Sequence, residues 1–281
     1  MIALFLFSIS CFMLPSVFNL INEFNNDSKI NEYNKTTKTF SDDDIKAKLL
    51  NAEKYNQILT TDYFKNDVNY STILNSYMDI LNSDGNGLIG YIEIPSINVK
   101  LPIYHGESEE VLKKGAAHVE QTSFPIGGLN TRACISAHSG YPEQKFFDDI
   151  DELSSGDLIY IYILNRSYCY KVYGRQIILP TEINSIKPES GKDILTLITC
   201  YPFGINSHRL LINAERTNVE NNEDNKTNST VEAAPLRNIS DVLIICSVIA
   251  SVAILTTIYI VFVVKRKKER RGEIESDFTY K

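Results

Sequence analysis

The chain has 281 residues, a formal net charge of −7 at pH 7 and five cysteines. This length allows one or two domains, and the acidic balance, with no basic patch outside the C-terminal tail, argues against nucleic acid as a partner. The cysteines form neither a Cys-x-x-Cys pair nor a zinc-binding spacing, so the sequence predicts no metal, no other cofactor and no disulfide framework.

The sequence has one apolar stretch at its N-terminus and another shortly before its C-terminus. Residues 1–21 contain no Lys or Arg and are expected to form an N-terminal transmembrane anchor or an uncleaved signal. Residues 242–264 carry no charge and are long enough to cross a hydrocarbon layer of ~30 Å, the alternative being a buried core helix. The tail, residues 265–281, begins with a basic cluster that favours the cytoplasmic side. The sequence therefore predicts a protein of the cell membrane, embedded in the lipid bilayer at both ends, with its middle outside the cell.

The first part of this middle region is predicted to be helical. Residues 22–40 are polar and rich in Asn, Lys and Thr, which predicts a mobile tether. Ser41 is a candidate helix cap, because acidic residues follow it and apolar residues then recur at helical spacing for about 15 residues. A second short helix is expected at 70–81, and Gly-rich residues 84–87 read as a turn. Residues 41–87 are thus expected to form a helical extension.

From residue 88 to residue 216 the pattern changes to short β-rich runs between turn signals. Such a density of short strands indicates a mainly β domain, a barrel or a sandwich. The strands are expected at 90–94, 99–104, 133–137, 158–164, 168–179, 194–199 and 209–214. Two short helical insertions are expected, at 111–116 and 145–153, and the acidic, Asn-rich residues 217–241 are predicted to be a disordered stalk.

Three cysteines lie between the apolar ends. Cys134 and Cys169 fall inside predicted strands and are expected to be small buried hydrophobic residues. Cys200 ends a β-branched run just before a turn, which places it at a rim rather than in the core. A thiol there can act as a nucleophile if a base and a cationic group lie nearby. From its position alone, a structural role for Cys200 is equally open.

A histidine and an arginine are candidate partners for that thiol. His138 also ends a predicted strand, and Arg209 opens the strand that follows Cys200. If those two strands pair, Arg209 comes near the thiol and can stabilise a thiolate or an oxyanion. The residue pattern gives this candidate trio but leaves contact between its members open. A structural, hydrogen-bonded role is expected for His105 and His118 and is also the alternative for His138, and the fourth histidine of the chain is His208.

Several ordered motifs resemble the sortase family. The run Thr196–Cys200 with Arg209 downstream resembles the family's T-L-x-T-C signature and its arginine. Further stretches that are similar to family motifs are Gly90–Pro95, Leu101–Gly106, His118–Gly128, Ile135–His138 and Asn206–Leu211. The resemblance covers about residues 88–216 and implies a closed eight-stranded β-barrel with short helices. The two apolar ends and the long N-terminal extension resemble class C, the pilin-polymerising sortases.

The resemblance also implies a reaction and its residues. Cys200 is the expected nucleophile, which cleaves an LPxTG-like sorting signal between Thr and Gly and forms a thioacyl-enzyme. His138 is the expected general acid and base, and Arg209 with the backbone N–H of Tyr201 is expected to stabilise the oxyanion. The acyl group then passes to an amine, a pilin lysine. The implied partners are pilins or surface proteins with C-terminal sorting signals.

Two positions depart from the family pattern. Class C sortases carry a lid of the type Asp-Pro-Phe or Asp-Pro-Trp, and the nearest equivalent is Asp62, Tyr63 and Phe64, with Tyr in place of Pro. A lid is expected there, with a mobile surface loop as the alternative. Ser139 stands where the family usually has Arg after the histidine. This departure leaves the base in place but is expected to alter substrate contacts.

Three other functions remain as alternatives. A housekeeping-type sortase would anchor surface proteins to the cell wall instead of polymerising pilins. A cysteine peptidase of another fold is compatible with the order of His138 and Cys200 in the chain, and it would transfer the acyl group to water. A non-catalytic binding module that faces the cell wall would form no covalent adduct with a sorting peptide.

Overall fold

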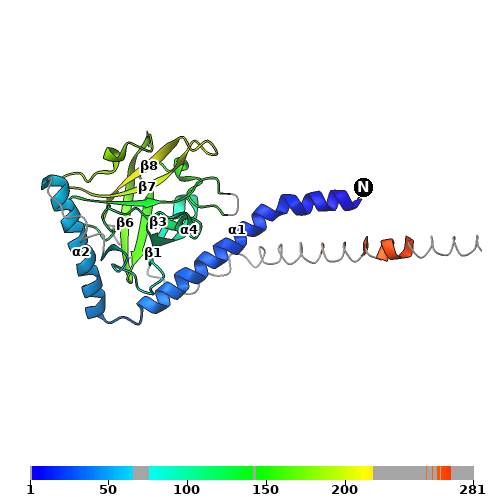
Figure 1. Cartoon of the computed structure of the whole chain (residues 1–281), viewed down its shortest axis with the longest axis horizontal. Coiled ribbons are helices and arrows are strands. Elements are labelled where there is room, and N and C mark those ends of the chain that lie inside the picture. The colour runs from blue at the N-terminus through cyan, green and yellow to red at the C-terminus, as the bar shows by residue number, and fades with distance from the viewer. Residues whose placement is uncertain are drawn as a thin grey trace, which may run out of the picture. The chain divides into compact units, whose positions relative to one another are not determined.

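The computed structural model describes residues 2–65, 76–141 and 144–217, together with 251, 255, 258–259 and 261–266. It divides into two compact units, one made of Met1–Leu20 with Glu223–Lys281 and one made of Ile21–Asn222. The second unit carries the β-strands and two packed helical segments (Figure 1).

The strands of this unit form a closed barrel in the order β1-β2-β3-β4-β7-β8-β6-β5. Their bounds are β1 Leu88–Ile94, β2 Val99–His105, β3 Ala116–His118, β4 Thr131–Ser136, β5 Leu158–Ile163, β6 Arg166–Ile178, β7 Asp193–Tyr201 and β8 His208–Arg216. Closure leaves no unpaired sheet edge. The prediction of a mainly β, eight-stranded barrel with short helices is therefore confirmed.

One strand and two helical insertions differ from expectation. The expected helix at 111–116 is the single turn α4, Glu109–Leu112, which Ser108 caps through the amide of Val111. Residues 116–118 instead form β3, because β2 and β4 offer backbone partners on either side of this short segment. Residues 145–153 contain only the 3₁₀ turn η2, Ile150–Glu152. The other 3₁₀ turns are η1 Pro95–Ile97 and η3 Ile183–Ile186.

The alternation of side chains along β7 separates the barrel core from an outer face. Leu195 and Leu197 belong to the hydrophobic core, and because successive side chains of a strand point to opposite faces, Thr196, Ile198 and Cys200 point outward. The same alternation holds on β4 and β8, where core residues take the intervening positions. The outer face of β4, β7 and β8 is therefore a continuous surface that ends near Cys200.

The predicted tether is wrong for residues 22–37, because the helix α1, Ile2–Thr37, continues through them. The buried side chains of this part of the helix recur every three or four residues, which is one helical face, and they are Asn26, Ile30, Tyr33 and Thr37. The hydroxyl of Tyr33 donates to the carbonyl of Ile89 at 2.8 Å and accepts from the amide of Leu164 at 2.9 Å. Composition alone suggested a tether because three of these four side chains carry polar groups.

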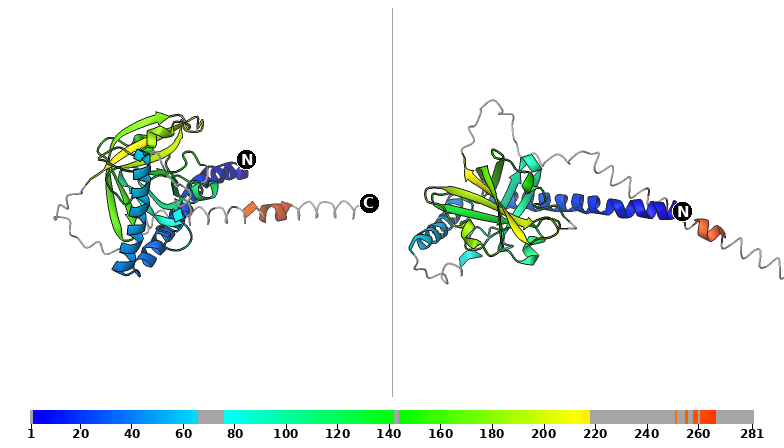
Figure 2. Two further views of the ribbon diagram at one scale, coloured as in Figure 1. Left: turned by 60° about the vertical axis from the view of Figure 1, so that its left-hand side comes forward. Right: turned by 90° about the horizontal axis from the view of Figure 1, so that it is seen from above.

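The second helix, α2, spans Asp42–Lys65 and lies alongside the barrel in both views of Figure 2. Ser41 caps it as expected, since its hydroxyl accepts from the amide of Asp44 at 3.2 Å. Asn56 fixes the helix to the barrel unit, because its side-chain amide donates to the carbonyl of Phe124 and accepts from the Phe124 amide. α2 has 24 residues, well beyond the 15 expected.

Several predictions fall partly or wholly outside the described residues. Of the helix expected at 70–81, residues 76–77 are helical and a turn follows, while 66–75 are not described. The stalk at 217–241 and most of 242–281 also lie outside the description. No helix in the described parts of the chain is long and apolar enough to span a membrane.

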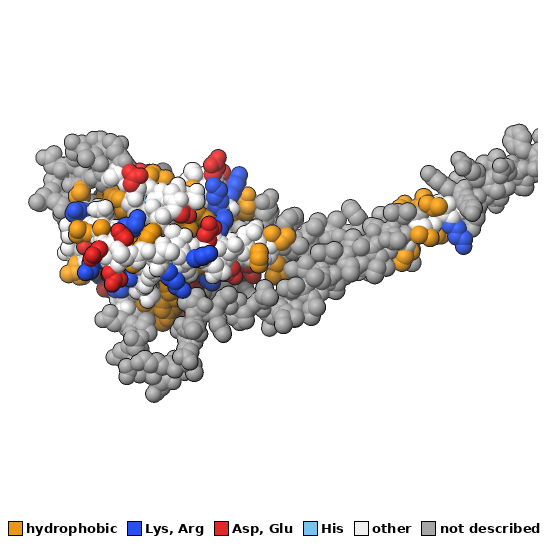
Figure 3. Space-filling model, turned by 90° about the horizontal axis from the view of Figure 1, so that it is seen from below, with side chains coloured by type: hydrophobic (Ala, Val, Ile, Leu, Met, Phe, Trp, Pro, Cys, Tyr) orange, Lys and Arg blue, Asp and Glu red, His pale blue; other side chains and the backbone are white. Residues whose placement is uncertain are grey.

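On the face drawn in Figure 3, acidic and basic side chains are interspersed.

Candidate active site

Three neighbouring strands bring the predicted trio into one row. In the parallel pairing of β4 with β7, Ser136 lies opposite Ile198. Beyond it, the amide of Ala137 donates to the carbonyl of Ile198 at 3.1 Å, which continues the register and sets His138 opposite Cys200. In the antiparallel pairing of β7 with β8, Cys200 lies opposite Arg209. Residues directly opposite on adjacent strands share a face, so all three side chains belong to the outer face.

The three thiols differ in their access to solvent. Cys134 and Cys169 are buried, as the sequence predicts, whereas Cys200 is partly exposed. Burial raises the pKa of the Cys134 thiol to about 12 and also raises the pKa of Cys169. Because the thiolate is the nucleophilic form, these two buried thiols are poor nucleophiles. Among the three cysteines of this unit, Cys200 is the one placed for chemistry.

Aromatic side chains hold the His138 ring. The ring stacks on Tyr141, with centroids 5.3 Å apart and planes 9° apart, and meets the edge of Phe146 at 6.2 Å. The carboxylate of Asp148 accepts hydrogen bonds from the amides of Gly140 and Phe146, both at 2.8 Å, and so ties together the segment that follows His138. The Nε2 atom of His138 is buried and has no hydrogen-bond partner among the described residues. A positioned ring with an uncommitted nitrogen suits proton transfer.

Neither Tyr141 nor Phe146 is among the site residues that the sequence predicts, although both follow His138 closely in the chain. Tyr141 lies in the turn that the sequence places after His138, and Phe146 begins a Phe-Phe-Asp-Asp run in the next stretch. An aromatic pair close to a candidate base is a reason to expect stacking.

Ser139 links the histidine segment to the nucleophile. Its hydroxyl donates to the main-chain carbonyl of Cys200 at 2.7 Å, and the hydroxyl of Thr199 donates to the carbonyl of Ala137 at 2.8 Å. One bond is donated from the histidine segment to β7, and the other is donated from β7 to the histidine segment. They fix the end of β7 against the chain that carries His138.

Arg209 and Tyr201 flank the thiol at the end of β7. The Nη1 atom of Arg209 donates to the carbonyls of Asn206 and His208, at 3.2 and 3.0 Å, within the turn between β7 and β8. A guanidinium has five N–H donors, so others are left to approach an oxyanion. Tyr201, the last residue of β7, pairs with His208.

His105 and His118 have structural partners, as expected, and His208 contacts its neighbour in the chain. The ring nitrogens of His105 lie 2.9 and 2.7 Å from the carbonyl oxygens of Gly87 and Ile80. The Nε2 atom of His118 lies 2.9 Å from the Ser123 carbonyl, and burial lowers the pKa of this histidine to about 3. The Nδ1 atom of His208 lies 2.8 Å from the hydroxyl of Ser207.

The candidate lid lies in the last turns of α2. The backbone of Asp62, Tyr63 and Phe64 is helical rather than a loop, and the side chains of 61–65 are outside the description. A lid at these residues stays a prediction. Among the described residues, no group of three or more His, Cys, Asp or Glu side chains is arranged to hold a metal ion.

The closed barrel and the outer-face row of histidine, cysteine and arginine define a β-barrel protein with a candidate cysteine nucleophile. Residues 92–217 match the sortase domain model. The chain is 35% identical to sortase C1 from Streptococcus agalactiae, with a TM-score of 0.64, over 69% of this chain and 100% of that one. This chain belongs to the sortase family.

Further relatives agree with this assignment. A structure of Clostridium perfringens sortase C with the C-terminal cell wall sorting motif is 42% identical, with a TM-score of 0.60, over 68% of this chain and 99% of that one. Sortase A of Bacillus anthracis is 33% identical over 46% of this chain and 60% of its own length, and sortase D of Bacillus subtilis is 30% identical over 41% and 54%. The chain thus spans somewhat over half of these curated relatives. The solved neighbours confirm the resemblance to class C.

Proposed function

We propose that this protein is a cysteine transpeptidase that cleaves an LPxTG-like sorting signal between Thr and Gly. The observation that carries the proposal is the single row of His138, Cys200 and Arg209 on the outer face of the barrel. It combines a solvent-accessible thiol, a base and a cation, which is the set that acyl transfer through a thioester requires.

In the proposed first step, the Cys200 thiol passes its proton to His138 and the Sγ atom attacks the carbonyl carbon of the signal's Thr. Arg209 and the backbone N–H of Tyr201 stabilise the negative charge on the carbonyl oxygen. As the C–N bond breaks, His138 gives a proton to the departing glycine amine. In the second step an amine attacks the thioester and gives a proton to His138, and His138 passes that proton to Sγ as the C–S bond breaks, which restores the thiol.

The proposed amine is a lysine of a pilin subunit, so that repeated turnover builds a polymer. The class C neighbours support this acceptor, and one of them was solved with a sorting motif. We propose that residues 1–21 and 242–264 anchor the chain in the cell membrane, with the barrel outside and residues 265–281 in the cytoplasm. Protease treatment of intact cells tests this topology, because barrel fragments should appear while the C-terminal tail stays protected.

The experiment that tests the reaction uses the purified full-length chain and an LPxTG-type peptide, with mass spectrometry as the readout. The wild type is expected to gain the mass of the acyl fragment, and Cys200→Ala is expected to gain none. Cys169→Ala is the matched control and should still form the adduct, because that thiol is buried. A thioester trapped on Cys200→Ala would contradict the assignment of the nucleophile.

The same preparation tests the lid and the alternatives. If Asp62 belongs to a lid, Asp62→Ala should be alkylated faster at Cys200 than the wild type, and equal rates would argue against it. Transfer to a pilin lysine rather than to water separates the proposal from an ordinary peptidase. Transfer to a cell-wall amine would instead favour a housekeeping-type sortase, and no adduct at all would leave a binding module.

A further inference from the structure

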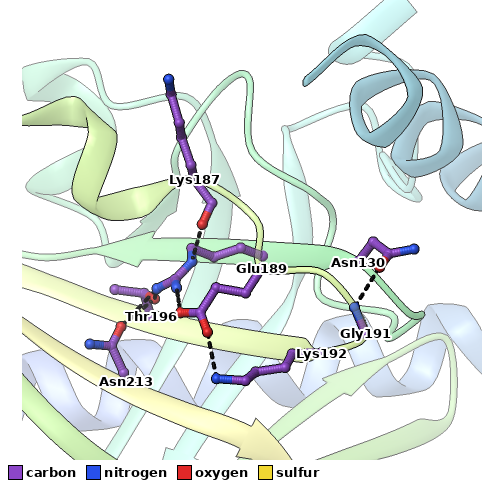
Figure 4. A network of polar contacts seen from close by, with 8 residues as sticks. Asn130, Lys187, Glu189, Gly191, Lys192, Thr196 and Asn213 are labelled. Atoms are coloured by element: carbon purple, nitrogen blue, oxygen red, sulfur yellow. Dashed lines mark hydrogen bonds and ion pairs between the residues drawn. The ribbon is translucent and has the colours of Figure 1, made fainter. Parts of the chain in front are cut away.

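A buried arginine lies on the same outer face as Cys200. The polar network around it, drawn in Figure 4, is not used by the catalytic row. Arg132 of β4 has a side chain that is only 4% exposed. Its Nη1 atom donates to Thr196 Oγ1 at 2.8 Å and to Asn213 Oδ1 at 2.9 Å, which attaches it to β7 and β8. The guanidinium therefore spans all three strands that form the row.

The other donors of Arg132 reach the loop between β6 and β7, residues 179–192. Nε donates to the main-chain carbonyl of Lys187 at 2.8 Å, and Nη2 donates to Glu189 Oε1 at 2.6 Å. The second carboxylate oxygen of Glu189 accepts from Lys192. The amide of Gly191 donates to Asn130 Oδ1 at 2.6 Å, just before β4. The amide of Thr131 also donates to the carbonyl of Lys192 at 3.2 Å, so Arg132 supplies two of the bonds that join the loop to β4 and is the side chain that links it to β7 and β8 as well.

The position of this attachment relative to the thiol follows from the strand register. Thr196 precedes Cys200 by four residues on β7, and Asn213 follows Arg209 by four residues on β8. At about 3.3 Å per residue, the network lies about 13 Å along the strands from the catalytic row. Both features share the outer face, because four is an even number of residues.

Burial changes between the two ends of this face. Thr196 and Cys134 are fully buried, whereas Ile198 and Ser136, next toward the row, are partly exposed like Cys200 and His138. The open surface beside the thiol therefore stops where Arg132 holds the loop to the sheet. An extended peptide with its carbonyl at Cys200 and its chain along β7 would meet the loop within about four residues.

We propose that Arg132 positions the acyl donor indirectly. It does so by fixing the β6–β7 loop at the end of the surface along β7 on which the donor binds. This inference rests on the proposed transpeptidase function. Arg132 does not touch the reacting atoms, so its effect is on how well the donor is held. A planar guanidinium with several fixed donors suits this task, because a lysine has a single charged nitrogen and cannot satisfy three strands and a loop at once.

The test compares Arg132→Lys and Glu189→Gln with the wild-type full-length chain, using a saturable LPxTG-type peptide and a fixed amine. We expect KM for the peptide to rise by about tenfold to a hundredfold, since small misplacement of substrate-positioning groups has effects of this size. At saturating peptide, kcat per folded molecule should stay within about twofold. Alkylation of Cys200 by iodoacetamide should keep its wild-type rate.

Controls separate positioning from mere stability. Glu109→Gln removes another carboxylate that pairs with a lysine, at 3.9 Å on α4, and it should leave KM unchanged. Glu189 is 41% exposed, so Glu189→Gln keeps the test valid even if Arg132→Lys fails to fold. If the wild type forms the acyl-enzyme and folded Glu189→Gln keeps the wild-type KM, the inference is overturned. A wild type that forms no acyl-enzyme would instead overturn the proposed function.

Discussion

The ring of His138 is held by its neighbours rather than by hydrogen bonds among the described residues. Stacking on Tyr141 and edge contact with Phe146 fix its plane, while Nε2 stays uncommitted. Aromatic contacts of this kind are worth about 0.5–1.5 kcal/mol beyond the area they bury. They orient the ring and leave Nε2 without a partner among the described residues, which is what the proposed acid and base roles require.

Ser139→Ala tests how closely the histidine segment must be tied to the thiol. The change removes the hydrogen bond from Ser139 to the carbonyl of Cys200, and such a bond contributes about 0.5–1.5 kcal/mol. We expect the rate of acyl-enzyme formation to fall about threefold to tenfold, as measured by rapid-quench mass spectrometry.

Two comparisons make that result interpretable. Ser139→Thr keeps the hydroxyl and should recover most of the rate, and Ser154→Ala changes an exposed serine before β5 and should have no effect. If Ser139→Ala and Ser139→Thr lose the same activity, the hydroxyl is not what positions the segment.

At the scale of secondary-structure elements, one tyrosine joins α1 to the barrel. The hydroxyl of Tyr33 donates to the carbonyl of Ile89 in β1 and accepts from the amide of Leu164, which follows β5. A buried polar group that loses its partner costs about 1–3 kcal/mol. The helix therefore contributes to the stability of the β1 and β5 region.

Tyr33→Phe is expected to lower the free energy of unfolding by about 1–3 kcal/mol, because it leaves two buried backbone groups without their partner. Urea unfolding followed by tyrosine fluorescence measures the change. Lys35→Ala, an exposed position on the same helix, should change stability by less than about 0.5 kcal/mol. Equal losses in both variants would show that the tyrosine bonds do not hold the helix.

Elements with a strong local pattern could be predicted, and those that depend on distant partners could not. β7 is readable because six β-branched or aliphatic residues precede Cys200 and a turn follows. β3 has three residues, two of them alanine, and exists because β2 and β4 supply its partners. The helical state of 22–37 likewise depends on contacts of Ile30 and Tyr33 that no local pattern in a polar segment reveals.

In the candidate site, too, some features could be predicted from the sequence and others depend on distant partners. Cys200, His138 and Arg209 were readable from their strand ends and their resemblance to a family. Their alignment in one row depends on the β4–β7 and β7–β8 registers, which the sequence leaves open. Arg132 was not recognised, because an arginine at the second position of a strand normally indicates an exposed side chain rather than a buried junction.

For the molecule as a whole, buried histidines make stability depend on pH. Burial lowers the pKa of His118 to about 3 and also lowers that of His105, against the opposing effect of its two carbonyl contacts. The unfolded chain, with histidines near their ordinary value of 6.5, binds more protons than the folded one below that pH. Stability is therefore full above about pH 6.5 and falls as the pH drops toward 3.

Urea unfolding at pH 7.5, 6 and 5 measures this dependence across the ordinary pKa of histidine. We expect the free energy of unfolding to fall by about 1–3 kcal/mol over that range, at up to about 1.4 kcal/mol per pH unit for each histidine. His118→Asn should flatten the dependence, and His208→Gln should not. A constant free energy from pH 7.5 to 5 would contradict buried neutral histidines.

The parallel ladder between β4 and β7 has a consequence for the order in which the protein is made. Its partners lie 62 residues apart along the chain, as Ser136 and Ile198 do, and such a distant pairing forms only after the intervening loop has closed. Until then the thiol and the imidazole belong to unconnected segments, and β8, which brings Arg209, is synthesised last of the strands. A nascent or half-assembled chain therefore lacks the row in which His138, Cys200 and Arg209 act together. Chemical competence arrives with barrel closure itself.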